Sequence, residues 1–176
     1  MKQHIKVCTL LTSLFISQWV VALPDDTSKP LNIQSNQARF DQKTGEAIYT
    51  GDVFVKQGTI EIQAQYLKVI TNPKTRKFTE LIATGHPAKF SQQIDWQGNM
   101  MISRGNKVVY KTAQSKVEIF GDGYLNRMDD KITADHIVYY INNGTFSAEK
   151  EGSGRVSMTL QPQTEKQQES SQKKEN

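Results

Sequence analysis

The stretch Gly51-Asp52-Val53-Phe54-Val55 recurs seventy residues later as Gly121-Asp122-Gly123-Tyr124-Leu125. The same offset holds without a gap from Asn36 to Ile70, and it places Asn106 opposite Asn36. Self-similarity at a fixed distance indicates a repeated structural unit rather than a single irregular fold.

Two fainter copies extend the repeat. Taking Gly51, Gly85, Gly121 and Gly154 as markers, the spacings are 34, 36 and 33 residues. The sequence therefore predicts four strand repeats.

Each unit has the pattern of a β-hairpin. In the first copy, Ala38 to Asp41 leads through the turn Lys43-Thr44-Gly45 into the run Ala47 to Val55. Runs rich in Val, Ile, Tyr, Phe and Thr between such turns are typical of paired strands. Because no window shows a 3.6-residue apolar stripe, the sequence predicts an all-β, mainly antiparallel domain.

Alternation of apolar residues assigns a face to each strand. Ala47, Tyr49, Val53 and Val55 share one face of the first unit. The alternation changes parity just after Ala64, and it changes again at the equivalent place of the third unit, which predicts a bulge or corner. Strands that turn a corner at the same place form two facing sheets, as in a sandwich or jelly roll.

The two ends of the chain differ from its middle. Residues 1–22 combine Lys2 and Lys6 with an apolar run and a small-residue cleavage site, which predicts a secretory signal peptide. We expect the domain to span residues 23–160, with Leu23 to Lys29 frayed, and residues 161–176 to form a disordered polar tail. Without residues 1–22 there is no cysteine, and 20 basic and 18 acidic residues remain. A charge of +2 is too weak to indicate nucleic acid as a partner.

No catalytic, metal or cofactor site is predicted. His86 and His136 have no Cys or second His at ligand spacing. The Asp129-Asp130 pair falls between strands, where turn chemistry explains it. Asp52 and Asp122 recur in register, which is more typical of a turn or ladder feature than of half an active site.

The pattern Thr50-Gly51-Asp52-Val53-Phe54-Val55-x-Gln57-Gly58-Thr59-Ile60-x-Ile62-x-Ala64 resembles the OstA-like domain family. The resemblance implies a twisted, open-ended antiparallel β-jelly roll in the periplasm that self-associates head to tail. It also implies a bridge for lipopolysaccharide between an LptC-like inner-membrane partner and an LptD-like outer-membrane partner. The acyl chains of lipid A would be shielded in a hydrophobic groove, without cofactor or catalysis.

The inward apolar rows, together with the family's lipid contacts, give a candidate lipid-binding set. A dry sandwich core made of the same residues is the alternative that their pattern leaves open. Two rival functions remain. One is a self-assembling structural or adhesion module without lipid cargo, and the other is an enzyme that acts on envelope polymers. The candidate lipid-binding residues are Leu31, Ile33, Phe40, Tyr49, Val53, Val55, Ile60, Ile62, Phe90, Tyr110, Val117, Ile119, Leu125 and Ile132.

Overall fold

The computed structural model describes residues 26–161 of the chain. The predicted signal peptide and residues 162–176 of the predicted tail lie outside this range. Neither helix in the described range, the short 3-10 segments η1 (Asp26–Ser28) and η2 (Thr112–Gln114), is long and apolar enough to cross a membrane.

Ten antiparallel strands in residues 26–161 form one continuous sheet, which confirms the predicted all-β class. The order is β1-β3-β4-β5-β6-β7-β8-β10, with β2 also paired to β3 and β9 also paired to β8. Neighbours in the chain are therefore neighbours in the sheet along most of its length. The strands are β1 (Asn32–Gln34), β2 (Gln37–Asp41), β3 (Glu46–Gln57), β4 (Ile60–Thr71), β5 (Phe78–Gln93), β6 (Met100–Lys111), β7 (Lys116–Arg127), β8 (Asp130–Tyr140), β9 (Thr145–Glu149) and β10 (Ser157–Thr159).

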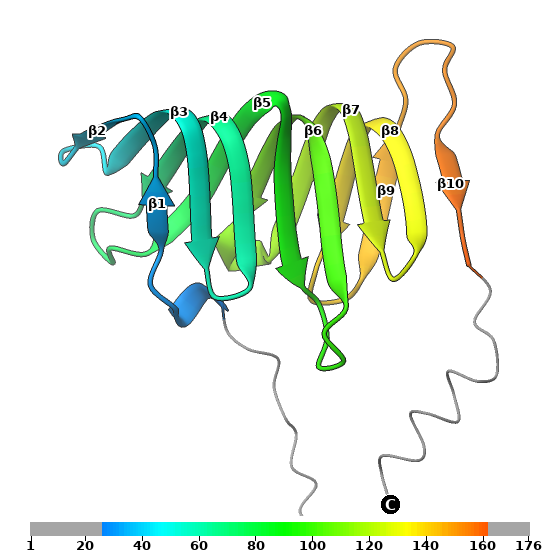
Figure 1. Cartoon of the computed structure of the whole chain (residues 1–176), viewed down its shortest axis with the longest axis horizontal. Helices are drawn as coiled ribbons and strands as arrows, with labels where there is room; N and C mark the ends of the chain where they lie inside the picture. The colour runs from blue at the N-terminus through cyan, green and yellow to red at the C-terminus, as the bar shows by residue number, and fades with distance from the viewer. Residues whose placement is uncertain (1–25, 162–176) are drawn as a thin grey trace, which may run out of the picture.

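A line of register shifts folds this sheet into two layers. The shifts fall near the middle of the long strands, between Thr50 and Val53 in β3 and between Phe120 and Gly123 in β7. Similar shifts interrupt β4, β5 and β6. The first layer contains β2 and β9, the second contains β1 and β10, and the long strands run through both (Figure 1). The predicted corner is confirmed, and the two facing sheets are halves of a single one.

The repeated Gly-Asp pairs lie at this corner line. Gly51 and Asp52 have φ angles of 75° and 44°, and Gly121 and Asp122 have 69° and 49°. These left-handed conformations favour Gly and are tolerated by Asp, whose short side chain fits them. Asp52 and Asp122 therefore act as turn features of the strand ladder, as expected.

Inward-facing rows run from one end of the roll to the other. Cross-strand partners in the first layer follow the row Phe40, Ala47, Val69, Leu81, Tyr110, Val117, Tyr139 and Phe146. The matching row of the second layer is Ile33, Val55, Ile62, Phe90, Ser103, Leu125, Ile132 and Met158. Side chains in the middle of both rows are almost fully buried, and each such Val, Leu or Ile contributes about 1.5–3 kcal/mol.

The ends of the roll are less regular than its middle. Gly85 lies within the corner segment of β5, but Gly154 lies outside the strands, between β9 and β10. The fourth repeat is therefore incomplete, because β9 has only five residues and does not continue through the corner. All five residues of β2 and all three of β10 are exposed, so both ends present open strand edges.

Candidate binding interior and seam

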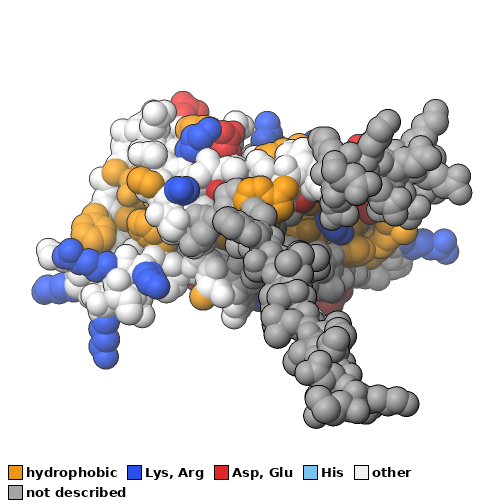
Figure 2. All heavy atoms as spheres, turned by 90° about the horizontal axis from the view of Figure 1, so that it is seen from below, with side chains coloured by type: hydrophobic (Ala, Val, Ile, Leu, Met, Phe, Trp, Pro, Cys, Tyr) orange, Lys and Arg blue, Asp and Glu red, His pale blue; other side chains and the backbone are white. Residues whose placement is uncertain are grey.

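The two layers are joined along the line of register shifts, which is the corner line. Away from that line, the free rim of one layer faces the free rim of the other. Turns 42–45, 72–77, 112–115 and 141–144 form the rim of the first layer, and turns 58–59, 94–99 and 128–129 form much of the other. We call the long opening between these rims the seam. Viewed from below, hydrophobic side chains of the described residues are spread along the long axis (Figure 2). No strand pairing in the described range crosses the seam.

A cavity of about 310 Å³ opens on the seam at the β1–β2 end and is called the N-terminal cavity. Both layers contribute, since Leu31 and Ile33 belong to the second and the other lining residues to the first. Seven of its eight lining residues carry hydrophobic side chains, and the lining comprises Leu31, Ile33, Phe40, Ala47, Tyr49, Val69, Thr71 and Phe78. This cavity is suited to a hydrocarbon chain.

The predicted lipid-binding residues fall into two groups. Four of them, Leu31, Ile33, Phe40 and Tyr49, line the N-terminal cavity. The remaining ten are buried in the core between the layers, and they are Val53, Val55, Ile60, Ile62, Phe90, Tyr110, Val117, Ile119, Leu125 and Ile132.

The middle of the interior is filled by side chains. Phe90 from β5 and Tyr110 from β6 pack with ring centroids 5.2 Å apart, and each is at most 2% exposed. A lipid chain reaches these rings only if the layers move apart.

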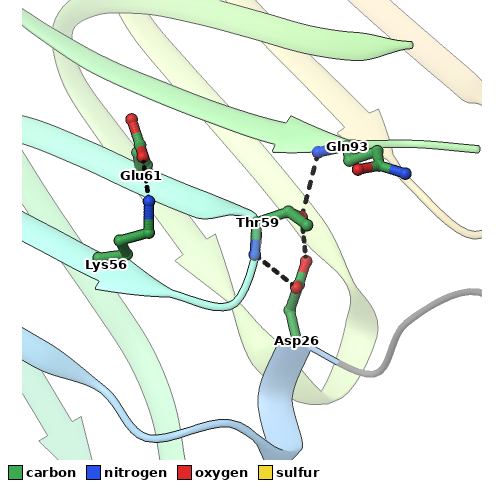
Figure 3. Close-up of polar contacts among 5 residues, drawn as sticks. All are labelled: Asp26, Lys56, Thr59, Glu61 and Gln93. Atoms are coloured by element: carbon green, nitrogen blue, oxygen red, sulfur yellow. Dashed lines mark hydrogen bonds and ion pairs between the residues drawn. The ribbon is translucent and has the colours of Figure 1, made fainter. Parts of the chain in front are cut away.

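Asp26 fixes the wall of the N-terminal cavity. Its Oδ1 accepts a hydrogen bond from the Thr59 backbone N–H at 2.7 Å, and its Oδ2 accepts from the Thr59 hydroxyl at 2.6 Å and from Gln92 Nε2 at 2.9 Å. The Thr59 hydroxyl in turn accepts from the Gln93 backbone N–H at 3.2 Å (Figure 3). These bonds hold η1 against the β3–β4 turn.

The expectation of a frayed segment from Leu23 to Lys29 is wrong for its described part. Asp26 is 4% exposed, and the buried side chain of Gln57 donates to the carbonyl oxygen of Lys29 at 3.0 Å. Loop-forming residues at a chain end predict fraying only where nothing distant binds them. Here a carboxylate satisfied by three donors anchors the segment, and β1 with Ile33 follows directly from it.

A second cavity, of about 280 Å³, opens on the seam towards the other end and is called the C-terminal cavity. It differs from the first in its side chains, because four of the nine lining residues carry charged or amide groups. The lining comprises Ile94, Asp95, Arg127, Met128, Tyr139, Ile141, Asn142, Asn143 and Gly144.

Two buried donors of the C-terminal cavity have no acceptor within residues 26–161. They are the Tyr139 hydroxyl and Arg127 Nε, and Tyr139 is only 1% exposed. Burial raises the pKa of the Tyr139 phenol, and the Arg127 charge opposes that rise only in part, so the hydroxyl keeps its proton. A buried donor without an acceptor costs about 1–3 kcal/mol.

The structure also places the histidine and aspartate residues that the sequence raised as alternatives. No group of three or more His, Cys, Asp and Glu side chains in residues 26–161 is arranged to hold a metal ion. His136 stacks on Phe120 with centroids 4.5 Å apart, and Asp52 lies at the corner.

Sequence reasoning missed several lining residues. Ala47, Val69, Thr71 and Phe78 complete the N-terminal cavity, and their alternation could have indicated them. The polar residues of the C-terminal cavity carry no sequence pattern, because three separate segments supply them.

Comparison with known proteins places these features in a family. The sequence model described as LptA/(LptD N-terminal domain) LPS transport protein matches residues 32–145. The chain is 31% identical over 159 residues to the lipopolysaccharide export system protein LptA of Haemophilus influenzae, covering 89% of this chain and 91% of that protein. It is 32% identical over 142 residues to the protein of the same name from Escherichia coli K12, covering 80% and 76%.

A solved structure shows the same fold. The crystal structure of LptH, described as the LptA homologous periplasmic component of the lipopolysaccharide transport device of Pseudomonas aeruginosa, superposes with a TM-score of 0.72. The match has 22% sequence identity and covers 79% of this chain and 100% of that one. The folded two-layer sheet is therefore shared.

Proposed function

The chain belongs to the LptA/(LptD N-terminal domain) family of LPS transport proteins, and we propose that it carries lipopolysaccharide through the periplasm with the acyl chains between its two layers. One observation supports this role above the others. The apolar interior meets an open seam, where the N-terminal cavity is lined by side chains from both layers.

The energetics of an acyl chain require such a lining. Exposing a chain to water costs about 0.8 kcal/mol per CH₂, so a chain of roughly a dozen carbons costs on the order of 10 kcal/mol. An isolated apolar patch leaves most of that chain in water. Rows of inward-facing apolar side chains that continue across the sheet shield the acyl chain along its whole length. This shielding needs no catalytic group.

Loading requires the layers to separate along the seam. In the closed state Phe90 and Tyr110 occupy the centre of the interior. Because no strand pairing in residues 26–161 links the two rims, opening the seam breaks no sheet ladder. The corner line, where the register already shifts, is the natural place for this movement.

Site-specific photo-crosslinking in cells that make lipopolysaccharide tests the proposal. A photoreactive phenylalanine at Tyr49 reports on the N-terminal cavity, and one at Phe90 reports on the interior. Lys56, which is exposed on the outer face and paired with Glu61, is the control. We expect lipid labelling at Tyr49 and Phe90 and little at Lys56. Equal labelling at all three positions would exclude an interior path.

We also propose that copies stack end to end. The strand order gives β1 and β2 a direction opposite to that of β9 and β10, so simple translation along the long axis continues the antiparallel alternation. The first-layer inward row begins at Phe40 and ends at Phe146, which are 65% and 38% exposed. Stacking would bury both rings and extend the apolar interior into the next copy.

The same proposal includes export of the protein to the periplasm and a bridge of stacked copies between the inner and outer membranes. Residues 1–22 would be removed as a signal peptide, residues 23–160 would form the roll, and residues 161–176 would remain a polar tail. The open strand edges at the two ends would pair with an LptC-like inner-membrane partner and an LptD-like outer-membrane partner. A self-assembling module without cargo would also form stacks, but it would give no lipid labelling.

A further inference from the structure

The C-terminal cavity contains a pair of donors that the packing of lipid chains does not require. Arg127 ends β7 on the second layer, and Tyr139 lies in β8 on the first. Both line the cavity, and the Tyr139 hydroxyl and Arg127 Nε are buried without an acceptor in the described range. Unpaired buried donors are rare in native proteins, and a ligand oxygen that reaches the two groups once the rims move apart would satisfy them.

The charges of the lining residues indicate which kind of ligand oxygen the two donors would bind. Arg127 is the only cation among the nine lining residues, and Asp95 is the only carboxylate. Asp95 is held in the β5–β6 loop, because its Oδ1 accepts from the Asn99 backbone N–H at 2.9 Å and its Oδ2 from Asn99 Nδ2 at 2.6 Å. A formally neutral lining favours a neutral acceptor over a phosphate, which binds where cations converge.

The apolar lining residues indicate which chemical group would carry the ligand oxygen. Ile94, Met128 and Ile141 place apolar surface beside the two donors. An ester or amide carbonyl at the head of an acyl chain combines a strong neutral acceptor with a hydrocarbon continuation. It also brings an oxygen that can accept from two donors at once.

We propose that Arg127 and Tyr139 donate hydrogen bonds to the carbonyl oxygen of an ester- or amide-linked acyl chain and so fix the head of that chain at the seam. The inference rests on the proposed function, since the chain must enter the roll. It adds a specific contact point to an otherwise apolar path. The donors come from opposite layers, so the bound carbonyl also bridges the two rims.

The first experiment measures binding by Tyr139→Phe, which removes only the hydroxyl. The probes are a dodecanoyl-amide amphiphile and the matching dodecyl ether, which lacks the carbonyl. We expect Tyr139→Phe to weaken binding of the amide by roughly 5- to 10-fold and to leave binding of the ether unchanged. Equal loss for both probes, or no loss for either, would overturn the assignment. The matched control is Tyr140→Phe, since Tyr140 is the next residue and is exposed.

A second measurement separates a ligand contact from a structural one. Because the Tyr139 hydroxyl has no protein acceptor, Tyr139→Phe should leave the unliganded melting temperature unchanged or raise it. A lower melting temperature would assign the hydroxyl a structural role and contradict the proposal.

A phosphate ligand is tested with Arg127→Gln. We expect this variant to lose the same factor in affinity for lipid A with and without its phosphates. A loss that disappears on dephosphorylation would replace the carbonyl by a phosphate. If the unmodified protein bound no lipopolysaccharide at all, the proposed function would fail. If it bound and neither variant changed the affinity, only the carbonyl contact would fail.

Discussion

Gly51 and Gly121 occupy corner positions that exclude a side chain in two ways. Their φ angles are 75° and 69°, and a Cβ at either glycine would lie 2.6 Å from Nδ2 of Asn36 or Asn106. The Asn-Gly contact thus recurs at the same offset as the Gly-Asp pair. We expect Gly121→Ala to lower the free energy of unfolding by about 2 kcal/mol, measured by urea denaturation.

Gly98→Ala is the matched control for this substitution. Gly98 has a φ angle of 89°, but nothing lies within 4 Å of a Cβ built there. The control therefore carries the backbone strain without the collision and should cost about 1 kcal/mol. Equal losses for the two variants would show that the Asn106 contact contributes nothing.

Glu118 on the outer face should make stability depend on acid pH. Lys116 Nζ lies 2.7 Å and Lys111 Nζ 3.1 Å from its Oε1. Burial raises the pKa of Glu118, but hydrogen bonds from Lys116 and Lys111 outweigh this and hold the pKa below its usual value. A carboxyl with a lowered folded pKa stabilises above its unfolded pKa of about 4.3, and that stability is lost as the pH falls through the folded pKa.

The test is Glu118→Gln, followed by unfolding between pH 2 and 7. We expect a loss of about 1 kcal/mol at neutral pH and a shallower decline of stability below about pH 4. Glu61→Gln is the control, since Glu61 pairs with Lys56 at 2.7 Å on an exposed surface. A decline as steep as that of the unmodified protein would rule out Glu118 as the source.

The strands and their corner were predictable from the sequence, whereas η1 was not. Alternation with a period of two fixes which side chains of β3 and β7 face inward, and its parity change marks the corner. These signals are local. The burial of Asp26 depends on Thr59, Gln92 and Gln93, which lie on two other turns or strands. A short polar segment carries no periodicity that could reveal such distant partners.

Asp26→Ala should release η1 from the β3–β4 turn. The substitution leaves the Thr59 amide and the Gln92 side-chain amide without their acceptor, so we expect a loss of about 2–3 kcal/mol. Hydrogen exchange at the Thr59 amide should accelerate more than exchange in β7.

Asp41→Ala provides the comparison. Asp41 Oδ1 accepts from the Lys43 backbone N–H at 2.8 Å and from that of Thr44 at 3.3 Å, but on an exposed turn. We expect this control to cost less than about 1 kcal/mol. If Asp26→Ala were equally mild, η1 would not be anchored by its carboxylate.

The C-terminal cavity arises only when the complete roll has formed. Its lining comes from the β5–β6 loop, the end of β7, and the end of β8 with its following turn. Arg127 and Tyr139 are close in the sequence but belong to opposite layers. They meet at the cavity because β8 turns at its corner and brings one layer back over the other. Periodicity predicts each strand and its inward face. It does not predict which rims meet, and so the polar pair was not recognised.

End-to-end stacking makes a prediction about register. Cross-strand partners on the outer face of the first layer form one row from Arg39 in β2 to Ser147 in β9. If copies repeat by translation without a shift, Ser147 of one copy lies beside Arg39 of the next. Cysteines at both positions should then form disulfides, because neighbouring strands bring Cα atoms within the required 4.4–6.8 Å.

Protein lacking residues 1–22, and therefore Cys8, permits this test without competing thiols. Under oxidising conditions Arg39→Cys/Ser147→Cys should give a concentration-dependent ladder of trimers and longer species on non-reducing gels. Either single variant can form at most a disulfide-linked dimer, because each copy has one thiol. The double variant Arg39→Cys/Gln37→Cys places both thiols on one end and should give no ladder. Dimers alone from Arg39→Cys/Ser147→Cys would indicate a closed contact between like ends, which would leave the apolar interior unable to continue from copy to copy.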